Sequence, residues 1–139
     1  MADNVRELRP RAPDSEKLTI NLGFVDLGRI DLMVRDGFYA NRADFIRTAV
    51  RNQLERQGEA VSQSVARKQL NLGLSHYTRQ DLEAARDAGL PLRIQVLGLA
   101  SIAPDVTPEL AREAIASVEV LGAFHASPAV KAALANRIA

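Results

Sequence analysis

The sequence predicts an α+β fold made of two modules, and three observations lead to it. Residues 17–22 alternate polar and apolar side chains, the period of a strand, and two helical patterns follow them. Residues 93–115 recur as residues 117–139, which indicates a repeat architecture. The composition, 47% hydrophobic with 18 basic and 17 acidic side chains, is that of an ordinary globular protein. We therefore expect a strand-helix-helix module followed by a β-α repeat domain with a small parallel sheet.

The composition also excludes several classes. The chain has no cysteine, so it has no disulfide framework, thiolate zinc site or thiol nucleophile. It has no apolar run of about 18 residues, the length that crosses a membrane, and its first residues lack the apolar core of a signal peptide. We expect a cytoplasmic protein without membrane contact.

Residues 1–15 hold few apolar side chains and read as a flexible basic arm, because such a segment cannot offset the entropy of ordering. Arg6, Arg9 and Arg11 could follow a phosphate backbone, although basic tails are common in proteins without that role.

Two helices follow the strand within the first module, residues 16–58. Asp26 is the expected N-cap of the first helix, and Gly37 is placed where a left-handed residue ends it. Asn41 is the expected N-cap of the second helix, and Gly58 is its expected end.

A lone strand with two short helices cannot close a core, so this module requires a second copy of itself. Antiparallel pairing of two such strands would place apolar side chains from both chains against four helices. The expected dimer core is Leu18, Ile20, Leu22, Ile30, Phe45, Ile46 and Val50. Lys17, Thr19 and Asn21 would form the outer face of a two-stranded ribbon, which fits the major groove of B-DNA and carries side chains that hydrogen-bond to base edges. A plain solvated face is the alternative for these three residues.

Three segments of this module, KLTINLG, DLGRIDLMVRDG and FYANRADFIRTAVRNQLER, closely resemble the ribbon-helix-helix DNA-binding proteins of the MetJ, Arc and CopG class. The most specific part is residues 37–47, which are similar to the turn between the family's two helices. The resemblance implies that Lys17, Thr19 and Asn21 read bases. It also implies that the backbone amides at Asn41 and Arg42 hold a phosphate, which a helix N-terminus favours.

Residues 59–67 are polar and weakly patterned, and they read as a linker or a marginal helix. Residues 68–139 divide into three β-α units whose helices start at Thr78, Thr107 and Ser127. A step of 24 residues puts Leu70 and Leu72 in register with Ile94 and Val96. It also predicts one open-face column of Asn71, Gln95 and Glu119 and another that contains Leu97 and Leu121.

The exposed leucines, Leu97 and Leu121, would form an interface for oligomerisation or for an effector or protein partner. A self-sufficient folding module is the alternative for residues 68–139. The glycines beside Leu22, Leu97 and Leu121 read as strand ends, since they form no phosphate-binding loop.

Catalysis has little support in the sequence. His76 and His125 are the two histidines, they are not in register in the repeat, and neither has a second ligand or a triad partner at a useful spacing. We expect no enzymatic activity, no metal and no cofactor.

The expected function is that of a homodimeric, sequence-specific regulator of transcription, a repressor that binds double-stranded DNA. An antitoxin or plasmid-maintenance protein of the same fold is the first alternative, in which residues 68–139 would wrap a toxin. A structural assembly protein built on the β-α repeats is an alternative of another class.

Overall fold

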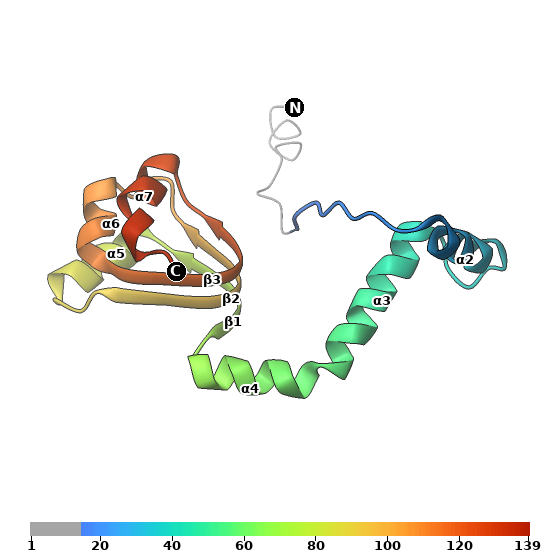
Figure 1. The fold of residues 1–139 in the computed structure, drawn as a ribbon. Coiled ribbons are helices and arrows are strands. Elements are labelled where there is room, and N and C mark those ends of the chain that lie inside the picture. Colours follow the sequence, from blue (N-terminus) through green and yellow to red (C-terminus); the bar gives the residue numbers. More distant parts are fainter. Residues whose placement is uncertain (1–14) are drawn as a thin grey trace, which may run out of the picture. The chain divides into compact units, whose positions relative to one another are not determined.

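The computed structural model describes residues 15–139, which form two compact units, one ending at Gly58 and one beginning at Glu59. Figure 1 follows the chain from the extended segment and helices of the first unit to the sheet of the second. The basic arm predicted for residues 1–15, with Arg6, Arg9 and Arg11, lies outside the described residues except for Ser15.

In the first unit, an extended segment precedes two helices, α2 (Phe24–Arg35) and α3 (Arg42–Arg56). The prediction that Asp26 caps α2 is wrong. The N-cap is Gly23, whose carbonyl accepts from the Leu27 amide at 3.0 Å, and Asp26 lies in the first turn. An extended glycine can end the preceding segment without a capping side chain, so the helix starts earlier than the acidic residue suggested.

The turn between the helices follows the prediction more closely. Gly37 has a φ of +85°, the left-handed conformation that glycine adopts at low cost. Asn41 caps α3, and its side-chain oxygen accepts from the Asp44 amide at 2.8 Å. Gly58 does not end α3, which stops at Arg56 with Gln57 as C-cap.

Gly58 instead begins α4 (Gly58–Lys68), so of the two readings of residues 59–67, a linker or a marginal helix, the structure has the helix. The helix ends at Lys68, the next residue, Gln69, has a left-handed φ of 55°, and the Leu70 amide donates to the Val65 carbonyl at 3.1 Å. This hydrogen bond closes the last turn and joins α4 directly to the buried Leu70 that precedes the sheet.

The second unit is a three-stranded parallel sheet in the order β1-β2-β3, as the repeat predicted. Its strands are β1 (Asn71–Tyr77), β2 (Leu92–Ile102) and β3 (Ile115–His125). Each strand leads into a helix: α5 (Arg79–Asp87), α6 (Pro108–Ala114) or α7 (Pro128–Ala133), the last followed by the short η1 (Ala135–Arg137). Thr78, Thr107 and Ser127 cap these three helices, as their sequence signals indicated.

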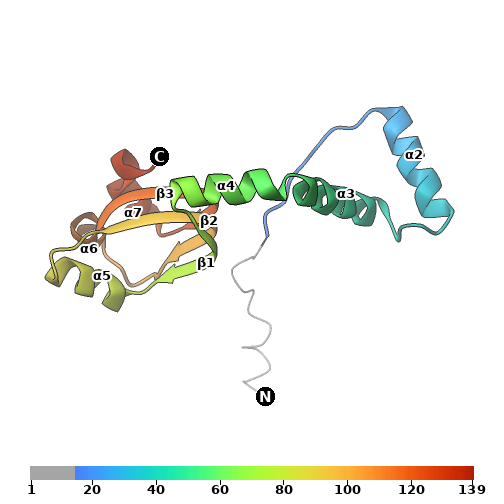
Figure 2. The same cartoon turned by 90° about the horizontal axis from the view of Figure 1, so that it is seen from below.

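The core of this unit lies between the sheet and its helices. Leu82 from α5, Ile94 from β2 and Leu134 after α7 are fully buried there. Figures 1 and 2 both place α5, α6 and α7 together on one side of the sheet. The unit therefore has a closed core on one face of the sheet, while the other face is uncovered by these helices.

The register of β1 differs from the prediction by one residue. Asn71 pairs with Val96, whereas Gln95 pairs with Glu119 as expected, so Asn71 is not part of that column. The matching feature is the dipeptide Leu-Gly, which recurs after 25 residues between the first two strands and after 24 between the last two.

The three glycines of this dipeptide form one row, Gly73, Gly98 and Gly122, inside the strands rather than at their ends. Their φ angles of +120°, +139° and +122° are rarely adopted by other residues. A Cβ on Gly98 would collide with the Gly73 carbonyl oxygen, and one on Gly122 with the Gly98 carbonyl oxygen. The glycines are thus sites of close approach between neighbouring strands.

No helix within residues 15–139 is long and apolar enough to cross a membrane.

Candidate nucleic-acid interface

The segment expected to form the ribbon, Lys17–Leu22, is extended but pairs with no strand in this single chain. Its apolar side chains are exposed to different degrees: 84% for Leu18, 50% for Ile20 and 37% for Leu22. Exposed leucine and isoleucine side chains on an unpaired strand are costly in water. The segment therefore leaves much of its apolar surface in contact with water.

An apolar hollow of about 420 Å³ lies where this segment approaches the two helices. Six of the seven residues predicted as the dimer core line it, from the extended segment, α2 and α3. They are Ile20, Leu22, Ile30, Phe45, Ile46 and Val50. The hydrophobic pattern of the sequence thus gathers these side chains in one place even without a second chain.

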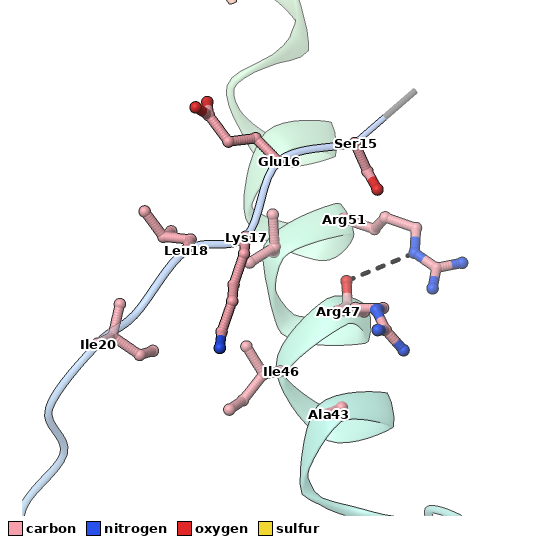
Figure 3. Close-up of a pocket in the computed structure, with 10 residues that line it drawn as sticks. Ser15, Glu16, Lys17, Leu18, Ile20, Ala43, Ile46, Arg47 and Arg51 are labelled. Atoms are coloured by element: carbon pink, nitrogen blue, oxygen red, sulfur yellow. Dashed lines mark hydrogen bonds between the residues drawn. The ribbon is translucent and has the colours of Figure 1, made fainter. Parts of the chain in front are cut away.

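A second hollow, of about 910 Å³, lies between the start of the extended segment and α3 (Figure 3). Leu18, the seventh predicted core residue, lines it together with Ile20, Ile46 and Val50. Its rim carries Arg47 and Arg51, and Arg51 donates to the Arg47 carbonyl at 3.4 Å. This side of α3 therefore exposes apolar surface in the second hollow as well as in the first.

The first unit buries very little. Among its described residues, Ile30 is the one hydrophobic side chain that is buried. Large apolar side chains remain exposed on all three of its segments: Leu18, Phe24, Val25, Leu32, Val50 and Leu54 are examples. A domain with so small a core needs further burial for stability.

The three predicted base-reading residues are all exposed. Lys17 lines the hollow beside α3, next to Leu18 and Ile20 (Figure 3). Thr19 and Asn21 line neither hollow. Strict alternation of faces is a property of a paired strand, and this segment pairs with no strand among residues 15–139.

The predicted phosphate site is at the N-terminus of α3. Here the Asp44 amide donates to Asn41, and the Ala40 amide donates to the Asp44 carboxylate at 2.9 Å. Within residues 15–139, no acceptor bonds the amides of Asn41 or Arg42. These two amides and the positive end of a 15-residue helix can bind an anion.

The Arg42 side chain has a different partner, which the sequence analysis missed. Its guanidinium donates twice to the Asp31 carboxylate on α2, from Nε and from one terminal nitrogen, each at 2.8 Å. These hydrogen bonds lower the pKa of Asp31 and raise that of Arg42. A phosphate at this helix start would thus meet the Arg42 amide while the side chain ties α3 to α2.

In the second unit, leucines from all three strands lie side by side on the open face of the sheet, the face opposite α5, α6 and α7. Leu97 and Leu121, the predicted interface residues, lie in one cross-strand row with Leu72, and the next row holds Leu74, Leu99 and Ala123. The repeat step of 24 residues does not bring Leu72 and Leu74 of β1 into these rows, because the register between β1 and β2 is 25 residues. The recurring Leu-Gly dipeptide was the signal that could have found it.

The two histidines are also in one row, contrary to the prediction. His76 on β1 pairs with Ser101 on β2, which pairs with His125 on β3. His76 Nδ1 and Ser101 Oγ share a hydrogen bond of 2.7 Å. Among the described residues, no group of three His, Cys, Asp or Glu side chains is placed to hold a metal ion.

A comparison of the sequence with known protein families finds one family that it matches. The family model described as the ribbon-helix-helix transcriptional regulator family matches residues 13–131, which span both units. No curated protein and no solved structure matches the chain. The match covers most of the sequence and includes the extended segment, the two helices and the parallel sheet, so the chain belongs to the ribbon-helix-helix transcriptional regulator family.

Proposed function

We propose that this protein is a homodimeric, sequence-specific DNA-binding regulator that acts as a repressor by occupying its site. Two extended segments pair antiparallel across a twofold axis and present Lys17, Thr19 and Asn21 from both chains to the major groove. The observation that carries the proposal is the apolar hollow beneath the exposed Ile20 and Leu22, because a second copy would cover it.

Dimerisation and DNA reading are one event in this proposal. Pairing the two segments satisfies their backbone hydrogen bonds and fixes the alternation of their side chains. Leu18, Ile20 and Leu22 then face the helices of both chains, and Lys17 turns from the hollow toward the outer face. Asn and Lys at such positions match adenine and guanine edges, respectively.

The N-terminus of α3 supplies the second contact. The amides of Asn41 and Arg42, which no acceptor bonds within residues 15–139, hold a backbone phosphate and so fix the position of the ribbon in the groove. The Arg42–Asp31 pair holds this helix start against α2. Arg6, Arg9 and Arg11 would add contacts to the phosphate backbone that depend on salt but not on sequence.

The folded second unit bears on the alternatives. An antitoxin tail that wraps a toxin is usually disordered when free, whereas residues 71–134 form strands and helices around their own buried core. A pure assembly protein would use the ribbon for pairing alone. In that case Thr19 and Asn21 would have no role in binding DNA.

The test begins with the capture and sequencing of DNA bound to the protein in cells, which supplies a cognate site. Binding to that site is then titrated by fluorescence anisotropy for the wild type and for Thr19→Ala with Asn21→Ala. Each good base contact contributes about 1–3 kcal/mol, so the double variant should bind the site at least tenfold more weakly and bind unrelated DNA unchanged.

Ser62→Ala with Gln63→Ala is the matched control, since it removes two exposed polar side chains from α4. The control should bind as the wild type does. Unchanged specific affinity in the Thr19/Asn21 variant would mean that the ribbon does not read bases.

A further inference from the structure

The open face of the parallel sheet is apolar at its centre and charged at one end. Leu72 and Leu74 on the edge strand are 73% and 76% exposed, and Leu121 on the opposite edge is also exposed. Leu97 and Leu99 lie between them on β2, half-buried by their neighbours. The neighbouring helix α4 has no buried residue, so it does not cover this face in the single chain.

The charges on this face complement each other. Arg93 and Glu119 are at the end where the strands begin, on the same side of the sheet as Leu97 and Leu121. Neither forms an ion pair within residues 15–139. Besides the row of His76 and His125, the face carries one cation and one anion, which suits a copy of itself better than a strongly acidic or basic partner.

The open face is too small to hold two independent proteins together. Three strands about 4.8 Å apart and the five residues from Leu72 to His76 span roughly 240 Å². A stable interface between independent proteins buries about 800 Å² on each partner. So small a patch is suited to a partner already held nearby, where the effective concentration is in the millimolar range.

We propose that this face packs against the same face of the second chain of the dimer, which rests on the dimerisation proposed above. The two sheets lie about 10 Å apart, as in a β-sandwich. A twofold axis along the strands brings the two charged ends together, so that Arg93 of each chain can reach Glu119 of the other. Leu97 then faces Leu97 of the partner, and Leu72 faces Leu121.

The pairing would give the dimer a second contact, at the sheets, besides the one at the ribbon. Distances between labels on the two chains can test it, because the chain contains no cysteine. Ala84→Cys in the full chain places one spin label on the exposed side of α5, away from the open face. Pulsed dipolar spectroscopy then measures the distance between the two labels of a dimer.

Paired sheets give a narrow distance distribution, a few ångströms wide. The same label with Leu97→Glu or Leu121→Glu should give a distribution spread over tens of ångströms, with unchanged circular dichroism. Leu90→Glu, also an exposed leucine but outside the open face, is the control and should leave the distribution narrow.

Sedimentation separates the two proposals. A dimer mass with a broad distribution in the labelled wild type overturns the pairing of the sheets and leaves the ribbon dimer intact. A distribution that stays narrow when Leu97 and Leu121 are changed also overturns it. A monomer mass overturns the ribbon dimer, and the sheet pairing with it.

Discussion

Arg42, the first residue of α3, holds Asp31 of α2 through two hydrogen bonds of 2.8 Å. The pair links the two helices across the turn that contains Gly37, and both side chains are half exposed. It fixes the direction in which the N-terminus of α3 points. In the proposed complex, this is the direction of the amides that hold the phosphate.

The Arg42–Asp31 pair predicts a specific dependence of stability on pH. The guanidinium lowers the pKa of Asp31, so the unfolded chain binds this proton more tightly than the folded one. The contribution of the pair is complete above the ordinary carboxylate pKa, near 3.8, and is lost as the pH falls through the lower folded value.

Urea unfolding between pH 5 and pH 2, at fixed protein concentration, measures this effect. Asp31→Asn should lower the midpoint slightly at pH 7 and weaken the fall at acid pH. Asp36→Asn, which removes a carboxylate that accepts no hydrogen bond within residues 15–139, should keep the wild-type slope. Parallel slopes for wild type and Asp31→Asn would contradict the prediction.

Two substitutions at Asn41 separate capping from phosphate binding. Asn41→Ala loses the hydrogen bond from the Asp44 amide and should destabilise the first unit by about 1 kcal/mol. Asn41→Asp retains a good cap and should preserve the midpoint of thermal unfolding, but its charge would repel a phosphate.

We expect Asn41→Asp to bind DNA about tenfold more weakly at low salt. The loss should be the same factor on cognate and unrelated sequences, because a phosphate contact does not depend on sequence. Anisotropy titrations at two salt concentrations measure this. Wild-type affinity in a fully folded Asn41→Asp variant would show that no phosphate lies at this helix start.

Val50 tests whether the hollow is a dimer interface. Its side chain is 52% exposed in the single chain, so Val50→Asp should cost less than about 0.5 kcal/mol if the first unit were a stable monomer. If a second copy covers it, the buried charge should disrupt the dimer and abolish DNA binding.

Sedimentation velocity gives the mass, and Leu90→Asp is the control for an exposed aliphatic residue outside this unit. The control should sediment as the wild type does. A dimer that tolerates Val50→Asp would exclude this face as the interface.

The glycine row predicts a graded effect on stability. Gly98→Ala and Gly122→Ala add both backbone strain and a collision with the neighbouring carbonyl, so each should destabilise the second unit by about 3 kcal/mol or more. Gly73→Ala has a similar φ but open space around its Cβ, so strain alone should cost about 1–3 kcal/mol. Urea unfolding followed by circular dichroism compares the three, and equal losses would argue against the collision.

Local signals in the sequence predicted the local structure well. Asn41, Thr78, Thr107 and Ser127 cap helices as expected, because a capping side chain bonds to an amide three residues away. The parallel order of the strands followed from the repeat. The start of α2 was misplaced because Asp26 is as suitable for a first turn as for an N-cap.

Features that depend on distant residues were harder to predict. The register of β1 brings Gly98 against the Gly73 carbonyl, a close approach that the 24-residue match between repeats does not reveal. The Arg42–Asp31 pair joins two helices across a turn whose geometry no local pattern gives. Lys17–Leu22 pairs with no strand among residues 15–139, and in the proposed dimer a second chain would supply its pairing partner.

The glycine row has a consequence for how the sheet reaches its correct alignment during folding. A slip of β2 by two residues would keep every side chain on its own face, so hydrophobic burial alone would barely oppose it. That slip would move Val96 or Ala100 to the place where Gly98 meets the Gly73 carbonyl, and the Cβ of either residue would collide with the carbonyl oxygen. The three glycines therefore select one register of the strands, because any other register places a Cβ against a neighbouring carbonyl.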